Sequence, residues 1–132
     1  MQNGTDRSVS NALRAVAMRQ PGLALLVLFG SRARGEDSTR SDWDFGYLAD
    51  PVVDPAALMA ALAEAVGSER IDLVDLARAS GLLRFRVARD GVLIHEAPPG
   101  RFDRFRFDAA RFWFDAEPVL RAGYDAVLDR LG

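Results

Sequence analysis

The chain has 132 residues, a length that suits one compact domain with a core of its own. All 17 basic residues are arginines, so a lysine-based mechanism is excluded, and the lack of cysteine excludes disulfides and thiolate metal sites. The formal net charge is −2, with acidic and basic residues interspersed, which argues against a broad nucleic-acid-binding face.

The N-terminal residues 1–6 are polar and acidic, unlike a secretory signal. The longest purely apolar run covers residues 23–29 and is far too short to cross a bilayer. We therefore expect a cytoplasmic protein.

The first half of the chain alternates between helical and strand patterns. Apolar residues at helical spacing predict a helix over residues 8–19, which Pro21 and Gly22 end. The apolar run 23–29 lies between turn residues and predicts a buried strand. Residues 31–41 are rich in Arg, Gly and Ser, which predicts a loop with room for one helical turn, and residues 42–48 predict a second strand.

The next helix has clear boundaries in the sequence. Asp54 can cap it, Pro55 suits its first position, and Gly67 marks its end. Residues 71–76 predict a third strand.

Residues 82–96 are compatible with two structures. Apolar residues alternate with arginines up to Asp90-Gly91, which is typical of a hairpin. Alternatively, Ser80 caps a short helix that runs to Arg89, and a fourth strand follows over residues 92–95. We favour the helix.

After a Pro-Pro-Gly break, residues 101–131 predict a helical segment that Pro118 kinks or restarts. Its apolar face begins with Phe102, Phe105, Ala109, Phe112, Trp113 and Ala116. Phe107 and Phe114 point away from that face. One interpretation is that they pack under a loop or lie singly on the surface. The other is that they form a partner-binding patch.

Two carboxylates stand at alternate positions of the second strand. Residues i and i+2 of a strand share a face, so Asp42 and Asp44 project together. Carboxylates held this close repel each other unless a cation lies between them. Their oxygens suit Mg²⁺, and two such ions can clamp the attacking and leaving oxygens of a phosphoryl transfer.

The end of the first strand is suited to phosphate. Gly30 permits close approach of the backbone, and Ser31 offers a hydroxyl and an N–H group at the start of a helical turn. The guanidinium groups of Arg32 and Arg34 can each bind two phosphate oxygens at once.

Gly30-Ser31, ten intervening residues and Asp42-Trp43-Asp44 resemble the signature of the DNA polymerase β-like nucleotidyltransferase superfamily. Within it, the chain is similar to the minimal nucleotidyltransferase (MNT) domains. The matching segments are residues 29–35, 41–44, 71–76 and 89–96. The resemblance implies an α/β (α+β) fold with a small mixed sheet of about four strands flanked by helices. We expect one domain over residues 1–132, with its catalytic core at about 8–96 and a C-terminal helical segment at about 101–131.

The resemblance also implies the roles of the site residues. The family needs a third carboxylate on a neighbouring strand, and Asp72 falls on that position. With Asp42 and Asp44 it would hold Mg²⁺, as two ions, and help to activate the attacking hydroxyl. Gly30 and Ser31 would hold the phosphates of ATP. Asp75 faces the other side of a regular strand and fits a strand-end or capping acid better.

Proteins that resemble this one are typically antitoxins encoded beside a HEPN-domain ribonuclease toxin. The resemblance thus implies transfer of AMP from Mg-ATP to a toxin tyrosine, which silences the toxin. Only about 30 residues follow the core, too few for a separate substrate domain. The partner would then supply the other wall of the site, with Phe107 and Phe114 as candidate contacts.

Two alternatives stay open. One is a small-molecule nucleotidyltransferase acting on an aminoglycoside-type hydroxyl, and resistance conferred by expression alone would favour it. The other is an antitoxin that acts by binding alone, although every catalytic position is present. A template-directed polymerase is disfavoured because the chain has no basic track for a duplex.

Overall fold

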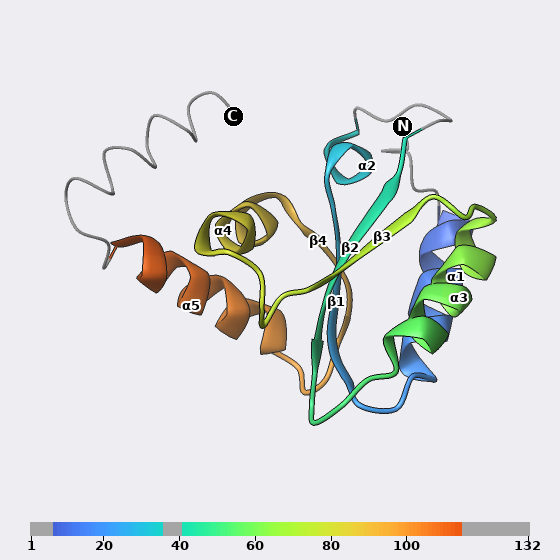
Figure 1. Ribbon diagram of the computed structural model, residues 1–132, viewed down its shortest axis with the longest axis horizontal. Helices are drawn as coiled ribbons and strands as arrows, with labels where there is room; N and C mark the ends of the chain where they lie inside the picture. The colour runs from blue at the N-terminus through green and yellow to red at the C-terminus, as the bar shows by residue number, and fades with distance from the viewer. Residues whose placement is uncertain (1–6, 36–40, 115–132) are drawn as a thin grey trace.

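The computed structural model describes residues 7–35 and 41–114, and its element order is shown in Figure 1. The helices of the described residues are α1 (Arg7–Met18), α2 (Ser31–Arg34), α3 (Pro55–Val66), α4 (Gly81–Asp90) and α5 (Arg101–Phe114). The strands are β1 (Leu23–Phe29), β2 (Trp43–Ala49), β3 (Ile71–Asp75) and β4 (Val92–Glu96).

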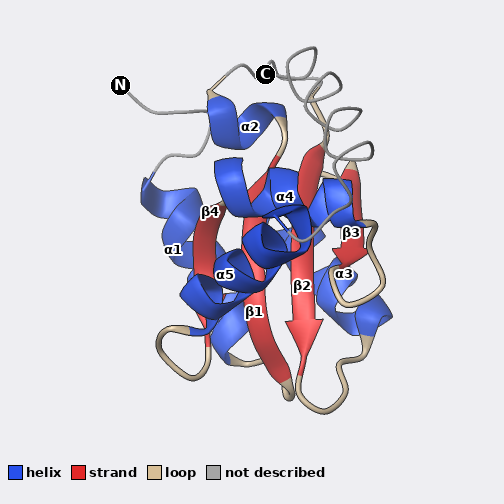
Figure 2. Ribbon diagram, turned by 90° about the vertical axis from the view of Figure 1, so that its left-hand side faces the viewer, coloured by secondary structure: helices blue, strands red, loops and turns tan. Residues whose placement is uncertain are grey.

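The strands form one mixed sheet in the order β3-β2-β1-β4. Strand β1 pairs antiparallel with both β2 and β4, whereas β2 and β3 are parallel. Helices flank this sheet, as Figure 2 shows from the side. The predicted fold class is confirmed.

Local capping explains where two of the helices begin. The Asp54 carboxylate accepts hydrogen bonds from the backbone N–H groups of Ala56 and Ala57 at the start of α3. The Ser80 hydroxyl accepts one from the N–H group of Leu83, 3.1 Å away. That cap confirms the helix over the hairpin for the segment before β4.

Element boundaries differ from the predicted ones by a residue or two. Strand β2 begins at Trp43, so Asp42 lies just before it, and β3 ends at Asp75. The polar segment after Gly30 forms the single helical turn α2.

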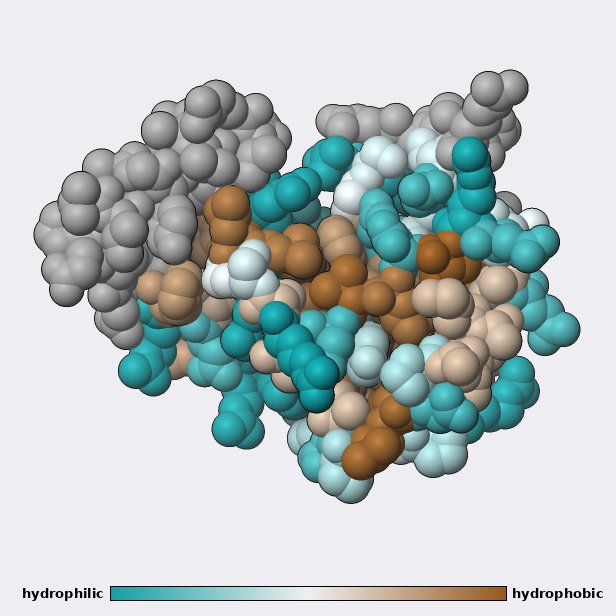
Figure 3. Space-filling view, in the orientation of Figure 1, coloured by the Kyte–Doolittle hydropathy of each residue, from teal (hydrophilic) through white to brown (hydrophobic). Residues whose placement is uncertain are grey.

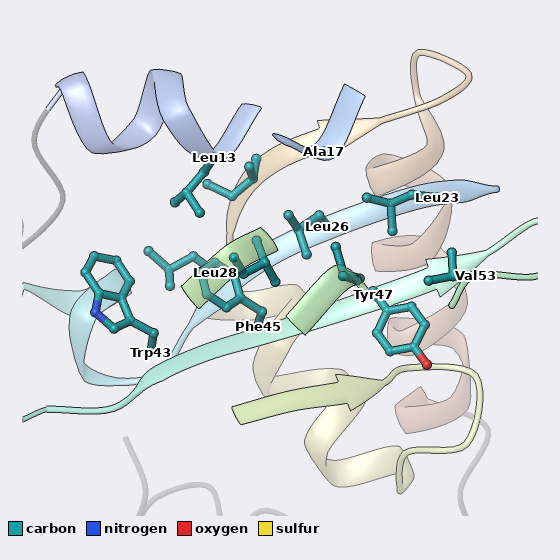
Figure 4. Packing of buried hydrophobic residues seen from close by; sticks show 12 residues of the cluster. Leu13, Ala17, Leu23, Leu26, Leu28, Trp43, Phe45, Tyr47 and Val53 are labelled. Atoms are coloured by element: carbon teal, nitrogen blue, oxygen red, sulfur yellow. The ribbon is translucent and has the colours of Figure 1, made fainter. Parts of the chain in front are cut away.

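Both faces of β1 are buried, which explains its unbroken apolar sequence. Leu26 and Leu28 belong to a core shared with α1, α3 and the aromatic residues of β2 (Figure 4). Leu25 and Val27 belong to a second core with α4 and α5. The sheet is therefore the middle layer, with α1 and α3 on one side and α4 and α5 on the other (Figure 1).

Helix α5 buries only part of its predicted apolar face. Phe102, Phe105 and Ala109 are buried, whereas Phe112 is 49% exposed. Phe112 lies near the C-terminal end of α5, where the helix runs away from the sheet (Figure 1). Its ring lies against the start of α4, because a Cβ added to Gly81 would overlap it.

The other C-terminal predictions have different outcomes. Phe107 points away from the core as expected and is 62% exposed. The side chains of Trp113 and Phe114, and everything from residue 115 onward, lie outside the described residues. No helix in the described part of the chain is long and apolar enough to span a membrane.

Candidate active site

Strand pairing brings the predicted site residues together at one end of the sheet. Asp44 pairs with Phe29 across β1 and with Asp72 across β3. Residues paired in parallel strands point to the same face, so the two carboxylates lie side by side. Trp43 and Phe45 alternate with Asp44 and enter the core with α1 and α3. Asp44 therefore faces the α4 side of the sheet.

Gly30 holds its backbone directly against Asp44. Its φ of 76° lies in the left-handed region, which favours glycine. A Cβ on this residue would overlap the Oδ2 atom of Asp44. Gly30 also has no side chain with which to cap α2, which begins at Ser31.

Three carboxylates, those of Asp42, Asp44 and Asp72, make the site strongly acidic. Asp42 and Asp72 are exposed and Asp44 is half-buried. Burial, then Asp72, then Asp42 raise the pKa of the Asp44 carboxyl above its ordinary value, and Arg34 and Arg86 oppose that rise. The three carboxylates are thus close enough to repel one another.

Arg32 takes a position that the sequence did not predict. Its side chain is buried, lies over the Trp43 ring at 4.1 Å, and donates to the carbonyl oxygen of Ser41 from Nε and Nη2. It thereby joins α2 to the segment that leads into β2. The Arg32 guanidinium is thus engaged within the protein, whereas exposed Arg34 lies on the carboxylate side.

Asp75 lies at the other end of β3. Its Oδ1 atom accepts a hydrogen bond from the N–H group of Ala77 at 3.0 Å, and its Oδ2 atom is 3.8 Å from Arg78 Nε. This is the geometry of a strand-end acid. Asp75 is paired with Tyr47, three positions along β2 from Asp44.

The carboxylate oxygens are donors that suit magnesium, but their positions do not form a complete metal-binding site. Among the described residues, no three Asp, Glu, His or Cys side chains are placed to hold a metal ion as they stand. Mg²⁺ takes few protein carboxylates and completes its shell with water and substrate phosphates. Asp42, Asp44 and Asp72 are therefore the residues that could hold it.

Sequence reasoning missed Arg86. Nothing in the spacing of residues 82–89 indicates which face of the sheet α4 covers. The structure brings this residue within electrostatic range of Asp44.

Comparisons with known proteins agree with this arrangement. Residues 11–99 match the family model described as "Polymerase beta, Nucleotidyltransferase". The protein adenylyltransferase MntA of Aphanizomenon flos-aquae (strain 2012/KM1/D3) is 40% identical over 98 residues, which are 65% of this chain and 65% of that protein. The alignment thus spans just under two thirds of that relative's length.

Three solved structures share the fold. A toxin–antitoxin structure with AMP-PNP has a TM-score of 0.69 at 28% identity, covering 92% of this chain and 97% of the other. The MntA–HepT toxin–antitoxin structure has a TM-score of 0.65 at 26% identity, covering 96% and 98%. A complex of the tri-AMPylated Shewanella oneidensis HEPN toxin with an MNT antitoxin has a TM-score of 0.62 at 27% identity, covering 93% and 95%.

Replacing Gly30 by alanine should destabilise the fold more than the same change at Gly67. Gly67 has a φ of 69° and open space around it, so Gly67→Ala should cost only left-handed strain, about 1–2 kcal/mol. Gly30→Ala adds the overlap with Asp44, for about 2–5 kcal/mol in total. Urea unfolding of both variants measures the difference, and equal losses would contradict the close approach.

Replacing Asp44 by asparagine should stabilise the metal-free protein. A folded-state pKa above the unfolded value means that the folded chain holds the proton more tightly. The bound proton on Asp44 therefore stabilises the folded state. This stabilisation is complete below the pKa of Asp44 in the unfolded chain and is lost as pH rises through its pKa in the folded protein. At neutral pH Asp44 is charged, so this stabilisation is lost and Asp72 and Asp42 repel its carboxylate. Asparagine removes that repulsion because it carries no charge.

Thermal melts in EDTA measure this effect. Asp44→Asn should melt higher than the wild type at pH 7.5, by on the order of a few degrees, and the gap should close toward pH 4. Glu64→Gln, an exposed change of the same charge on α3, is the control. An Asp44→Asn melting point at or below that of the wild type would contradict the repulsion.

Proposed function

Because the chain belongs to the polymerase β nucleotidyltransferase family, we propose that it transfers AMP from Mg-ATP to a tyrosine hydroxyl of a HEPN ribonuclease toxin and thereby neutralises it. The observation that carries this proposal is the placement of Gly30 against Asp44, with Asp72 in register beside it. A phosphate-binding turn and paired carboxylates on adjoining strands are the parts that this transfer requires.

The proposed chemistry follows from what each residue can do. The acceptor oxygen attacks the α-phosphorus, the new P–O bond forms, and the bond to the departing pyrophosphate breaks. Asp72 lies at the exposed rim, where it can help to take the proton of the attacking hydroxyl. Gly30 and Ser31 hold the phosphates with backbone N–H groups and the Ser31 hydroxyl.

The carboxylates of Asp42, Asp44 and Asp72 would hold magnesium in this reaction. Magnesium, when bound, supplies positive charge to the phosphate oxygens and lowers the pKa of the acceptor hydroxyl. Asp44 and Asp72 are held by neighbouring strands, so their spacing depends on β2–β3 register rather than on a loop, and Asp42 lies just before β2.

The choice of acceptor is supported by the named relatives. One is a protein adenylyltransferase, one is a toxin–antitoxin structure with an ATP analogue, and one contains an AMPylated HEPN toxin. The sharing of this fold at 26–28% identity over most of both chains makes a HEPN-type protein the best-supported partner.

Helix α5 offers a candidate contact for that partner. Phe107 borders a groove of about 360 Å³ between α4 and α5, together with Phe85 and Ala110. Hydrophobic side chains reach the surface over this side of the molecule (Figure 3). An exposed aromatic beside a groove is a typical anchor point at protein interfaces.

The transfer is tested with purified protein, ATP, Mg²⁺ and the HEPN protein encoded in the adjacent reading frame. We expect the HEPN protein to gain mass in units of AMP. Asp42→Asn combined with Asp44→Asn should lower the rate by at least about a thousandfold, because it removes the metal-binding charge. A toxin of unchanged mass would refute the proposal, and a double variant that still neutralises the toxin in cells would show that binding alone suffices.

Replacing Phe107 by alanine should weaken binding to the HEPN protein by about tenfold or more, as expected for an aromatic anchor. Stability should hardly change because the side chain is 62% exposed. Titration calorimetry measures the affinity, with Met18→Ala as control, since Met18 is 75% exposed on α1 across the sheet. Equal affinities for both variants would exclude Phe107 from the interface.

A further inference from the structure

Helix α4 covers the face of the sheet on which the carboxylates lie. Val87 and Ala88 are buried against β1 in the second core. At the end of the helix, a Cβ on Gly91 would overlap Val27, two residues before the Phe29 that pairs with Asp44. The last turns of α4 are therefore pressed against β1 close to the site.

Arg86 is the arginine of this helix whose charge acts on Asp44. It is half-buried and lies within electrostatic range of both Asp44 and Asp90. Arg34, from α2, interacts with the same two carboxylates. Two cations from separate elements thus converge on the carboxylate side of the sheet.

The guanidinium of Arg86 differs from its neighbours on α4. Arg84 lies over the Phe105 ring at 5.3 Å, and Arg89 donates to both carboxylate oxygens of Asp90 at 3.0 and 2.9 Å. Arg86 has no ion pair within 4 Å and no hydrogen bond from its side chain to the described residues. Its donors lie near the site without a hydrogen-bond or ion-pair partner in residues 7–35 and 41–114.

We propose that Arg86 binds the triphosphate of the nucleotide in the reaction proposed above. A planar guanidinium with five N–H donors matches the geometry of phosphate oxygens and can bind two of them at once. A triphosphate brings several negative charges into a site that already contains three carboxylates, so fixed cations are needed beside the metal. Arg86 supplies one of them from the helix that covers the site.

The same contact has a consequence for the transfer step. As the bond between the α-phosphorus and the pyrophosphate oxygen breaks, negative charge accumulates on the pyrophosphate. A guanidinium already in place stabilises that charge without reorganisation. Arg86 therefore acts both on binding and on the rate.

The inference rests on the proposed function and is tested by measuring affinity for two probes, Mg-ATP and Mg-tripolyphosphate, by calorimetry. Arg86→Met should weaken both by about tenfold or more, because it removes charge-assisted hydrogen bonds. Arg86→Lys should recover part of the loss, since it keeps the charge and loses the paired donors. Arg104→Met, the same charge change at an exposed site on α5, should leave both affinities unchanged.

Melting temperatures separate binding from folding. Both Arg86 variants should melt within a few degrees of the wild type, because Arg86 forms no ion pair within 4 Å among the described residues and Arg86→Met removes only its longer-range attraction to Asp44 and Asp90. Tripolyphosphate affinity within twofold of the wild type in Arg86→Met, or a large loss of stability in both variants, would overturn the inference. The wild type could bind both probes, and the Arg86 variants lose affinity, while no AMP is transferred to the toxin. In that case the proposed acceptor is wrong, and the proposed role of Arg86 in binding the triphosphate is supported. A wild type that binds neither probe would overturn both proposals.

Discussion

The site depends on one close approach, that of the Gly30 backbone to the Asp44 carboxylate. The antiparallel register places Phe29 opposite Asp44, and the chain must turn away immediately afterwards to begin α2. Only a residue without a Cβ allows the turn to stay in contact with the carboxylate. The start of α2 and the Asp44 carboxylate are thereby held against each other by the same two strands.

This arrangement costs stability, and the rest of the fold compensates for it. Asp44 is half-buried beside two other carboxylates, which is unfavourable without a cation. Strand β1 supplies the compensation, because its side chains are buried on both faces between two helical layers. Arg32 adds a local clamp, in which its guanidinium stacks on Trp43 and donates to the Ser41 carbonyl. The repulsion is therefore confined to a rim that the core holds in place.

Sequence reasoning predicted those features that depend on local periodicity. Burial of β1 and the cap of α3 could be predicted because runs of apolar residues and an Asp-Pro pair act over a few positions. The alternation near Phe85 was ambiguous for a physical reason. Leu83 and Val87 pack against the sheet, while Phe85 lies on the other side of the same helix, beside the groove of Phe107. A helix with two apolar faces resembles a strand over so few residues.

Features that depend on how elements pack could not be predicted. Phe112 follows the helical period of the buried face, but the sheet ends before α5 does. The sequence offers Arg32 and Arg34 equally as phosphate-binding residues. In the structure Arg32 stacks on Trp43, whereas Arg34 lies on the carboxylate side. The position of Arg86 depends on which face α4 covers, a property of three-dimensional packing that single-sequence patterns do not contain.

The distribution of charge explains why the arginines come from helices and the acids from strands. Adjacent strands fix Asp44 and Asp72 side by side on one face of the sheet, since register allows little freedom. Phosphate oxygens extend away from the sheet, so the groups that bind them must reach over it. Helices α2 and α4 lie at the end and on the face of the sheet from which long side chains can do so (Figure 2). In the proposed reaction, the sheet determines where the bond is made, and the helices determine how the nucleotide is held for it.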